Sequence, residues 1–137
     1  MMKLFAGCAL LLTCSLAHAA DYKVIANPAV AASEISGDDL KSIFLQTKTS
    51  LPGSGHVEPV LAKEGGTHEA FLKECLSKSD TALSTYYRSL VFTGKAVMPK
   101  SFASDAEIVG YVGKTKGAVG YISASAPAAG VKILSVK

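Results

Sequence analysis

The sequence predicts an α/β fold in which a mixed sheet is flanked by helices. Strand-like and helix-like segments alternate along the chain, which is the pattern of strands covered by helices. The 137 residues are enough for one hydrophobic core and too few for two ordinary domains. No low-complexity linker or internal repeat divides them. We therefore expect a single domain.

The first residues are expected to form a secretory signal peptide, residues 1–19. Lys3 precedes an uncharged apolar stretch over residues 4–16, and the stretch closes on Ala-His-Ala, with small residues at the positions that a signal peptidase reads. The stretch is shorter than the roughly 20 residues that cross a bilayer. We therefore expect cleavage after Ala19 and a periplasmic domain over residues 20–137.

Charge and cysteine usage argue against nucleic-acid binding and against an internal disulfide. The net charge is +3 and the basic residues are scattered, so nucleic acid is not an expected partner. Cleavage of the signal peptide would remove Cys8 and Cys14 and leave Cys75 alone, so no internal disulfide is expected. The spacing of Cys75 after Phe71 predicts a buried, inert thiol on the apolar face of a helix.

The first half of the domain is expected to hold two strands and one helix. The β-rich run at residues 22–28 ends in Asn-Pro, which is typical of the end of a strand. Ser36 has the residue type that caps a helix, and the apolar residues that follow share one face: Leu40, Ile43 and Phe44. A turn at residues 51–55 precedes a second strand at residues 57–63, in which Pro59 indicates an edge position or a bulge.

Two further helices are expected after this strand. One begins near Thr67, and the next has Ser79 or Asp80 as its cap. The second helix carries an amphipathic stripe at i, i+3, i+4, i+7 and i+8, formed by Leu83, Tyr86, Tyr87, Leu90 and Val91. Residues 93–103 are then expected to form a loop.

The last part of the chain is expected to hold one helix and two closing strands. Ser104 and Glu107 form a capping box for a helix that carries Ile108 and Val112. The strands are predicted at residues 117–123 and 131–136, separated by a loop of proline, alanine and glycine.

The segment KEGGT, Lys63 to Thr67, is the strongest candidate site because it lies where a strand turns into a helix. Gly65 and Gly66 would let a ligand approach the backbone. The first amides of a helix have no intrahelical acceptor, and with the helix dipole they suit an oxyanion. Thr67 would add a hydroxyl, Lys63 a positive charge, and Glu64 an acceptor for the proton of a partly protonated anion.

Other interpretations of these and nearby residues stay open. The glycines could form a tight turn in which Thr67 only caps the helix. Lys95 and Lys100 could extend a basic rim around the turn, although loop lysines often serve solubility. His68 could belong to that rim and make an anion site sensitive to pH.

No metal site, cofactor or catalytic set is expected from the remaining residues. His56 and His68 are expected to lie on the surface, because no cysteine or acid stands at metal-ligand spacing from them. Arg88, on the long amphipathic helix, is expected to be solvated. We find no nucleophile–base pair and no paired carboxylates, so an enzyme is the least favoured class.

Three segments resemble, in order and spacing, the phosphate-binding-protein-like periplasmic solute-binding proteins (type II periplasmic binding proteins). They are ISGDDLKSIFLQTKTSLPGSG, PVLAKEGGTHEAFLK and the stretch from YYRSLVFTGK to GAVGYIS. The family's helix ending in Ile-Phe corresponds to Ile43–Phe44. Its Ser-Gly-Thr phosphate turn before a phenylalanine corresponds to Gly65–Thr67 with Phe71, and its late GAIGY strand to Gly117–Tyr121.

The resemblance implies the fold of one lobe of such a protein and a ligand that is phosphate or a similar oxyanion. It also implies a relation to the substrate-binding component of phosphate ABC transport. The family's turn has arginine, aspartate and serine where this chain has Lys63, Glu64 and Gly65, which removes a hydroxyl and the bidentate fork of arginine. One lobe would present half a site, completed by a second lobe, a homodimer partner or a membrane transporter. The alternative function is an envelope interaction or accessory protein that keeps the fold without transport or tight ligand binding.

Overall fold

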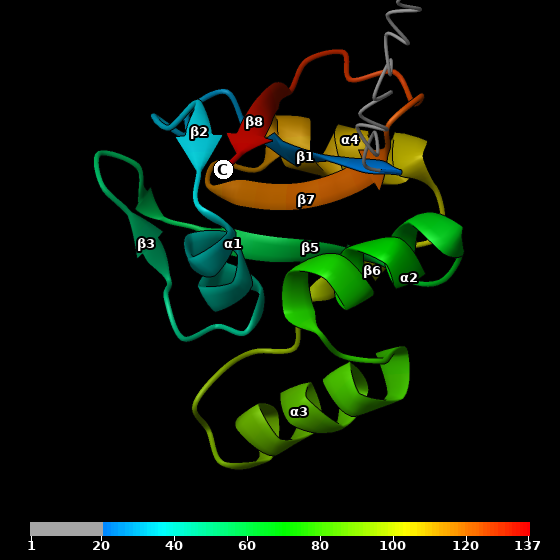
Figure 1. Cartoon of the computed structure of the whole chain (residues 1–137). Coiled ribbons are helices and arrows are strands. Elements are labelled where there is room, and N and C mark those ends of the chain that lie inside the picture. The colour runs from blue at the N-terminus through cyan, green and yellow to red at the C-terminus, as the bar shows by residue number, and fades with distance from the viewer. Residues whose placement is uncertain (1–20) are drawn as a thin grey trace, which may run out of the picture.

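A six-stranded mixed sheet forms the centre of the computed structural model, which describes residues 21–137. The predicted signal peptide, with Cys8 and Cys14, lies outside the described residues. The strands follow the order β2-β8-β1-β7-β5-β6 (Figure 1). Their bounds are Tyr22–Ala26 for β1, Glu34–Ile35 for β2, Glu58–Ala62 for β5, Lys100–Phe102 for β6, Ala118–Ser123 for β7 and Lys132–Val136 for β8. The short strands β3 (Ser50–Leu51) and β4 (Gly55–His56) pair separately.

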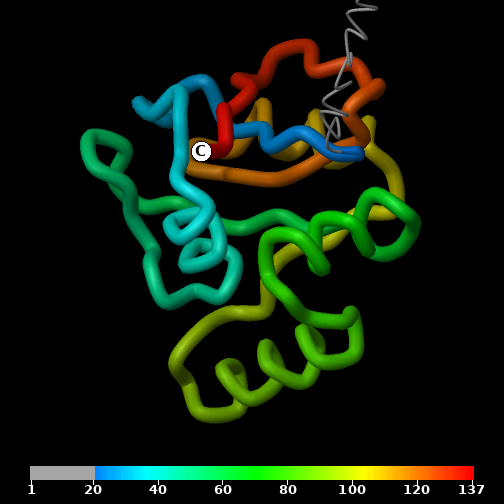
Figure 2. The backbone as a smooth tube through the Cα atoms, viewed as in Figure 1, coloured from blue at the N-terminus to red at the C-terminus, as the bar shows by residue number. Residues whose placement is uncertain are grey.

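Helices cover both faces of the sheet, with α1 and α2 in front of it and α4 behind it in Figure 1. The helices are α1 (Gly37–Phe44), α2 (Gly66–Phe71), α3 (Asp80–Phe92) and α4 (Asp105–Lys114), and a π-helical turn, η1 (Leu72–Leu76), continues α2. Figure 2 shows the path of the chain from this π-helical turn into α3, which lies apart from the sheet. The predicted α/β class, with a mixed sheet flanked by helices, is confirmed.

Alternation along the strands builds two cores, one on each face of the sheet. On β1, Val24 packs toward α1 and α2, whereas its neighbour Ile25 packs toward α4. The same alternation separates Tyr121 from Ile122 on β7. Both faces are therefore covered, which explains why consecutive residues of the central strands are buried, Val24 to Ala26 on β1 and Ala118 to Ile122 on β7.

The predicted serine caps are confirmed at three helices. Ser36 Oγ accepts from the Asp39 amide at 3.1 Å, Ser79 Oγ from the Ala82 amide at 3.1 Å, and Ser104 Oγ from the Glu107 amide at 3.2 Å. Each bond satisfies an amide that has no acceptor inside its own helix.

Two strand predictions need correction. The segment expected to be a loop, residues 93–103, contains β6, which pairs in parallel with β5. As a result β5 lies inside the sheet and not at its edge. Pro59 is in register with Val119 of β7 on one side. It is tolerated because pairing with β6 on the other side, which its nitrogen faces, starts one residue later, at Val60.

Helix α3 is held to the body of the protein by its tyrosines. Tyr87 Oη donates to the Phe44 carbonyl at 2.5 Å, and Tyr86 Oη donates to the Leu45 carbonyl at 2.5 Å. Leu83 and Tyr87 are buried, as the predicted stripe requires, but Val91 is 43% exposed because the helix extends past its support. No helix within residues 21–137 is both long and apolar enough to cross a bilayer.

Candidate functional site

The segment Lys63–Thr67 forms the expected junction between β5 and α2. The Lys63 amide donates to the Phe102 carbonyl at 2.9 Å, which is the last bond between β5 and β6. Gly65 occupies the N-cap position with φ 107° and ψ 170°, a conformation open to glycine and strained for other residues. The Gly65 carbonyl accepts from the Glu69 amide at 3.0 Å and closes the first turn of α2.

The amides at the start of α2 are free to receive a ligand. Within the described residues, no protein oxygen accepts a hydrogen bond from the amides of residues 64–68, and no side chain caps the helix. Residues 63–66 are exposed, and a Cβ placed on Gly65 or Gly66 would meet no atom within 4 Å. The junction is therefore neither sealed nor filled by the protein. The interpretation of Thr67 as a helix cap is wrong, because Gly65 holds that position.

A hollow of about 310 Å³ lies beside this junction, between the carboxyl end of β5, one side of α3 and the residues around the start of β6. Lys63 and Arg88 supply positive charge to its wall, and Asp80 supplies negative charge. Ser84 and Ser101 add hydroxyl groups. Arg88, which we expect from the sequence to be solvated, is exposed, and it also lines the hollow that Lys63 borders. The sequence indicates this placement only through the position of Arg88 directly after Tyr87, which faces the body of the protein.

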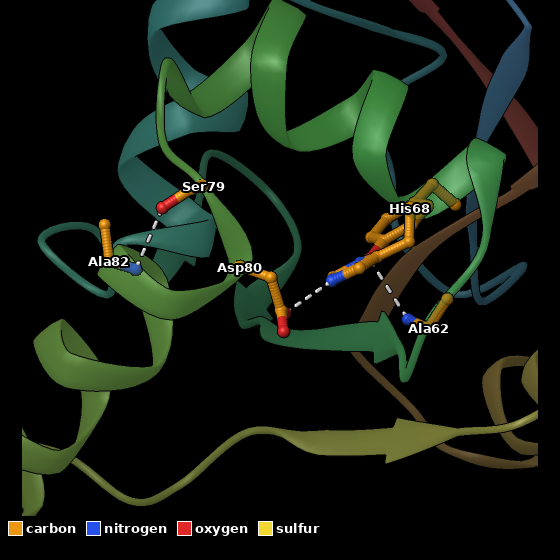
Figure 3. Close-up of polar contacts among 6 residues, drawn as sticks. Ala62, His68, Ser79, Asp80 and Ala82 are labelled. Atoms are coloured by element: carbon orange, nitrogen blue, oxygen red, sulfur yellow. Dashed lines mark hydrogen bonds and ion pairs between the residues drawn. The ribbon is translucent and has the colours of Figure 1, made fainter.

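His68 is not a surface residue, and this corrects the sequence prediction. Its side chain is 3% exposed and lies between β7 and the start of α3. Nε2 is 2.8 Å from Asp80 Oδ1, and Nδ1 is 2.5 Å from Tyr121 Oη. Figure 3 shows the imidazole pointing toward Asp80, with the Ala62 amide on its other side.

The hydrogen bonds around His68 define its tautomer. Tyr121 Oη accepts from the Ala62 amide at 3.1 Å, so its own proton goes to Nδ1 of His68. The imidazole proton then sits on Nε2 and points to Asp80. Because burial raises the pKa of Tyr121 well above its usual value, the phenol stays a donor. Both ring nitrogens of His68 are therefore hydrogen-bonded within the protein.

The other predicted rim residues lie elsewhere. Lys95 and Lys100 line a separate hollow of about 380 Å³, together with His56. Lys100 pairs with Val60 and Phe102 with Ala62, so Lys100 stands at the opposite end of β6 from the junction. Its Nζ lies over the ring of Tyr111, 5.0 Å from the ring centre. The structure therefore brings together residues 63–68 and not these two lysines.

Cys75 is partly buried and its Sγ lies 3.1 Å from Tyr22 Oη. Burial raises the pKa of the thiol, which keeps it protonated and poorly reactive. Among residues 21–137, no group of three or more histidine, cysteine, aspartate or glutamate side chains could hold a metal ion.

No family model and no curated protein matches the sequence. Solved structures match it over 85% of the chain at 16% identity. A phosphate ABC transporter substrate-binding protein with bound phosphate from Clostridium perfringens has a TM-score of 0.65 and is covered over 44% of its length. An ABC-type phosphate transport receptor from Vibrio cholerae has a TM-score of 0.56 and is covered over 46% of its length. A possible phosphate binding protein from Planctomyces limnophilus has a TM-score of 0.57 and is covered over 41% of its length.

These matches define the class of fold. The chain spans less than half the length of the solved proteins that it resembles. Its sheet and helices are similar to one lobe of phosphate-binding proteins of ABC transporters, which are substrate-binding proteins. The resemblance noted from the three sequence segments is therefore confirmed at the level of fold.

Proposed function

We propose that this chain is an exported solute-binding domain that binds inorganic phosphate or a similar oxyanion at the start of α2. The observation that carries the proposal is the row of amides at residues 64–68 that no protein oxygen within the described residues accepts from, the first three of which belong to exposed residues. Such amides, at the positive end of a helix, attract negative charge. Lys63 adds a full positive charge beside them, and the fold is shared with proteins described as phosphate receptors.

Glu64 gives the proposed site a preference between anions. Phosphate keeps at least one proton near neutral pH, and a carboxylate beside the amides accepts that proton in a hydrogen bond. Sulfate carries no proton there, so it meets only repulsion from Glu64. We expect phosphate to bind more tightly than sulfate, and Glu64→Gln to reduce the difference.

The affinity of the isolated chain is expected to be low. An ion pair 4 Å apart is worth about 1 kcal/mol in water and about 4 kcal/mol near a protein surface with less solvent. The junction is open to water, so its contacts lie near the weaker limit. A second lobe, a second copy of this chain or a membrane transporter would raise the affinity by covering it.

Isothermal titration calorimetry with phosphate and sulfate tests the proposal. We expect a millimolar dissociation constant for phosphate and a loss of about fivefold to tenfold in Lys63→Gln, corresponding to about 1 kcal/mol or somewhat more. Lys73→Gln is the matched control, because Lys73 is also exposed, on the π-helical turn away from the junction, and should leave binding unchanged. Absence of phosphate binding at millimolar concentration would favour the envelope accessory protein instead.

A further inference from the structure

The C-terminal end of α3 and the loop after it expose four large apolar side chains within eight residues. Phe92 is 92% exposed, Val97 80%, Met98 47% and Val91 43%. We call this set the α3 tip. In Figure 1, α3 and its loop lie at the far side of the molecule from β1, β7 and β8, so the tip projects from the body. Apolar side chains gathered in this way mark a binding surface.

The α3 tip has a defined shape. The Lys95 amide donates to the Leu90 carbonyl at 2.9 Å, and the Gly94 amide donates to the Val91 carbonyl at 3.1 Å, so the loop folds back on the helix end. Gln46 Nε2 donates to the Val97 carbonyl at 3.0 Å and ties the loop to the segment after α1. Presenting these side chains therefore needs little ordering on binding.

Along the sequence, the charges nearest the α3 tip are all positive, whereas in space the nearest acids are Asp80, in the hollow that Arg88 and Met98 line, and Glu58, in the hollow that Lys95 and Val97 line. Residues 81–104 contain Arg88, Lys95 and Lys100 and no aspartate or glutamate. Within the described part of the chain, neither Arg88 nor Lys95 forms a salt bridge. Arg88 precedes Phe92 by four residues, so both lie on the same side of α3. The exposed apolar side chains are thus flanked by two cations without an acidic neighbour in sequence.

We propose that the α3 tip inserts into the surface of a membrane that contains anionic lipids. A projecting apolar end flanked by cations suits the boundary between headgroups and acyl chains, where apolar side chains enter and lipid phosphates meet the cations. A second copy of this chain fits less well, since a symmetric contact would bring two patches of the same positive charge together.

A tryptophan placed in the α3 tip tests the proposal, because the chain has no tryptophan of its own. In the full-length chain, Phe92→Trp is mixed with vesicles of phosphatidylcholine containing phosphatidylglycerol, and its emission is recorded with and without brominated lipid. We expect a blue shift and quenching with anionic vesicles. Ile133→Trp is the matched control, since Ile133 is 54% exposed on β8, away from the tip, and its emission should not change.

Two further variants separate the contribution of the tip cations to vesicle binding from that of the α2 junction. Arg88→Gln with Lys95→Gln should weaken vesicle binding roughly 30-fold, taking about 1 kcal/mol for each cation near an anionic surface. Lys63→Gln should leave it unchanged, which separates the tip from lipid phosphate held at the α2 junction. Vesicle binding in which Phe92→Trp stays unshifted, or a shift caused by self-association without lipid, would overturn the proposal.

Discussion

Gly65 and Gly66 are neighbours, but they are glycine for different reasons. Gly65 has φ 107°, which a side chain would strain, whereas Gly66 is the first residue of α2 and has ordinary helical surroundings. The pair could be recognised in the sequence as a junction. Which of the two is required by the backbone depends on the path of the chain into α2, and the sequence does not carry that information locally.

This difference predicts opposite effects on stability. Gly65→Ala should lower the free energy of unfolding by about 1–3 kcal/mol, the cost of a strained backbone. Gly66→Ala should leave it unchanged or raise it by up to about 1 kcal/mol, because alanine favours the helix and limits the unfolded chain. Urea unfolding followed by circular dichroism measures both. Equal destabilisation by the two substitutions would contradict the assigned conformations.

His68 has hydrogen-bond partners that the sequence does not indicate, although it lines the hollow beside Lys63. Its place next to the glycine turn suggested a ligand contact, but its ring is buried between Tyr121 and Asp80. Its two partners lie 53 and 12 residues away in the chain, so no spacing rule connects them to it. Buried polar side chains are satisfied by such long-range partners, which only the folded chain brings together.

Removing the imidazole should therefore destabilise the fold. His68→Phe leaves the buried Tyr121 hydroxyl proton without an acceptor, which costs about 1–3 kcal/mol of unfolding free energy. Asp80→Asn keeps an acceptor oxygen and should cost less than about 1 kcal/mol, since Asp80 is mostly exposed. Denaturant unfolding of both variants, and of His68→Phe combined with Tyr121→Phe, checks this. The double variant should lose less unfolding free energy than the sum of the losses in His68→Phe and Tyr121→Phe alone.

At the scale of elements, the helices were predicted better than the strands. Ser36, Ser79 and Ser104 cap helices through contacts with residues three positions later, so the signal is local. Strands of two or three residues, such as β2 and β6, exist because of pairing with distant partners. Their sequences carry too few residues for a periodic pattern.

The position of β5 inside the sheet could not be predicted for the same reason, because it depends on pairing with the short strand β6. Pro59 is a local signal for an edge strand, and it lies in the first two residues of β5, where pairing with β6 has not yet begun. The proposed site on α2 depends on this arrangement, because the last bond between β6 and β5 is made by the Lys63 amide, where the junction starts. The motif could be found in the sequence, but the hollow beside it could not.

At the scale of the whole molecule, two buried tyrosines connect distant parts of the fold. Tyr87 joins α3 to the end of α1, and Tyr121 stacks on Phe71 with ring centres 3.9 Å apart. Burial raises the pKa of both phenols well above their usual value. The neutral phenol is therefore the form that the folded protein requires.

Stability is expected to fall at alkaline pH. In the unfolded chain both tyrosines ionise near pH 10, whereas in the folded protein they stay neutral to higher pH. The unfolding free energy should thus be unaffected by these groups below about pH 10 and decrease above it. Urea midpoints between pH 8 and 11 measure the effect, and Tyr87→Phe should make the decrease less steep. A constant midpoint across this range would contradict the burial of these groups.

The central claim is that the amides at the start of α2 bind an oxyanion, and an amide-resolved NMR titration tests it most directly. Phosphate added to the ¹⁵N-labelled protein should shift the signals of residues 64–68 with one saturating curve, and sulfate should shift them less at equal concentration. Signals from β8, far from the junction, serve as the reference. Amides of residues 64–68 that do not move at saturating phosphate, or shifts confined to other parts of the protein, would contradict the claim.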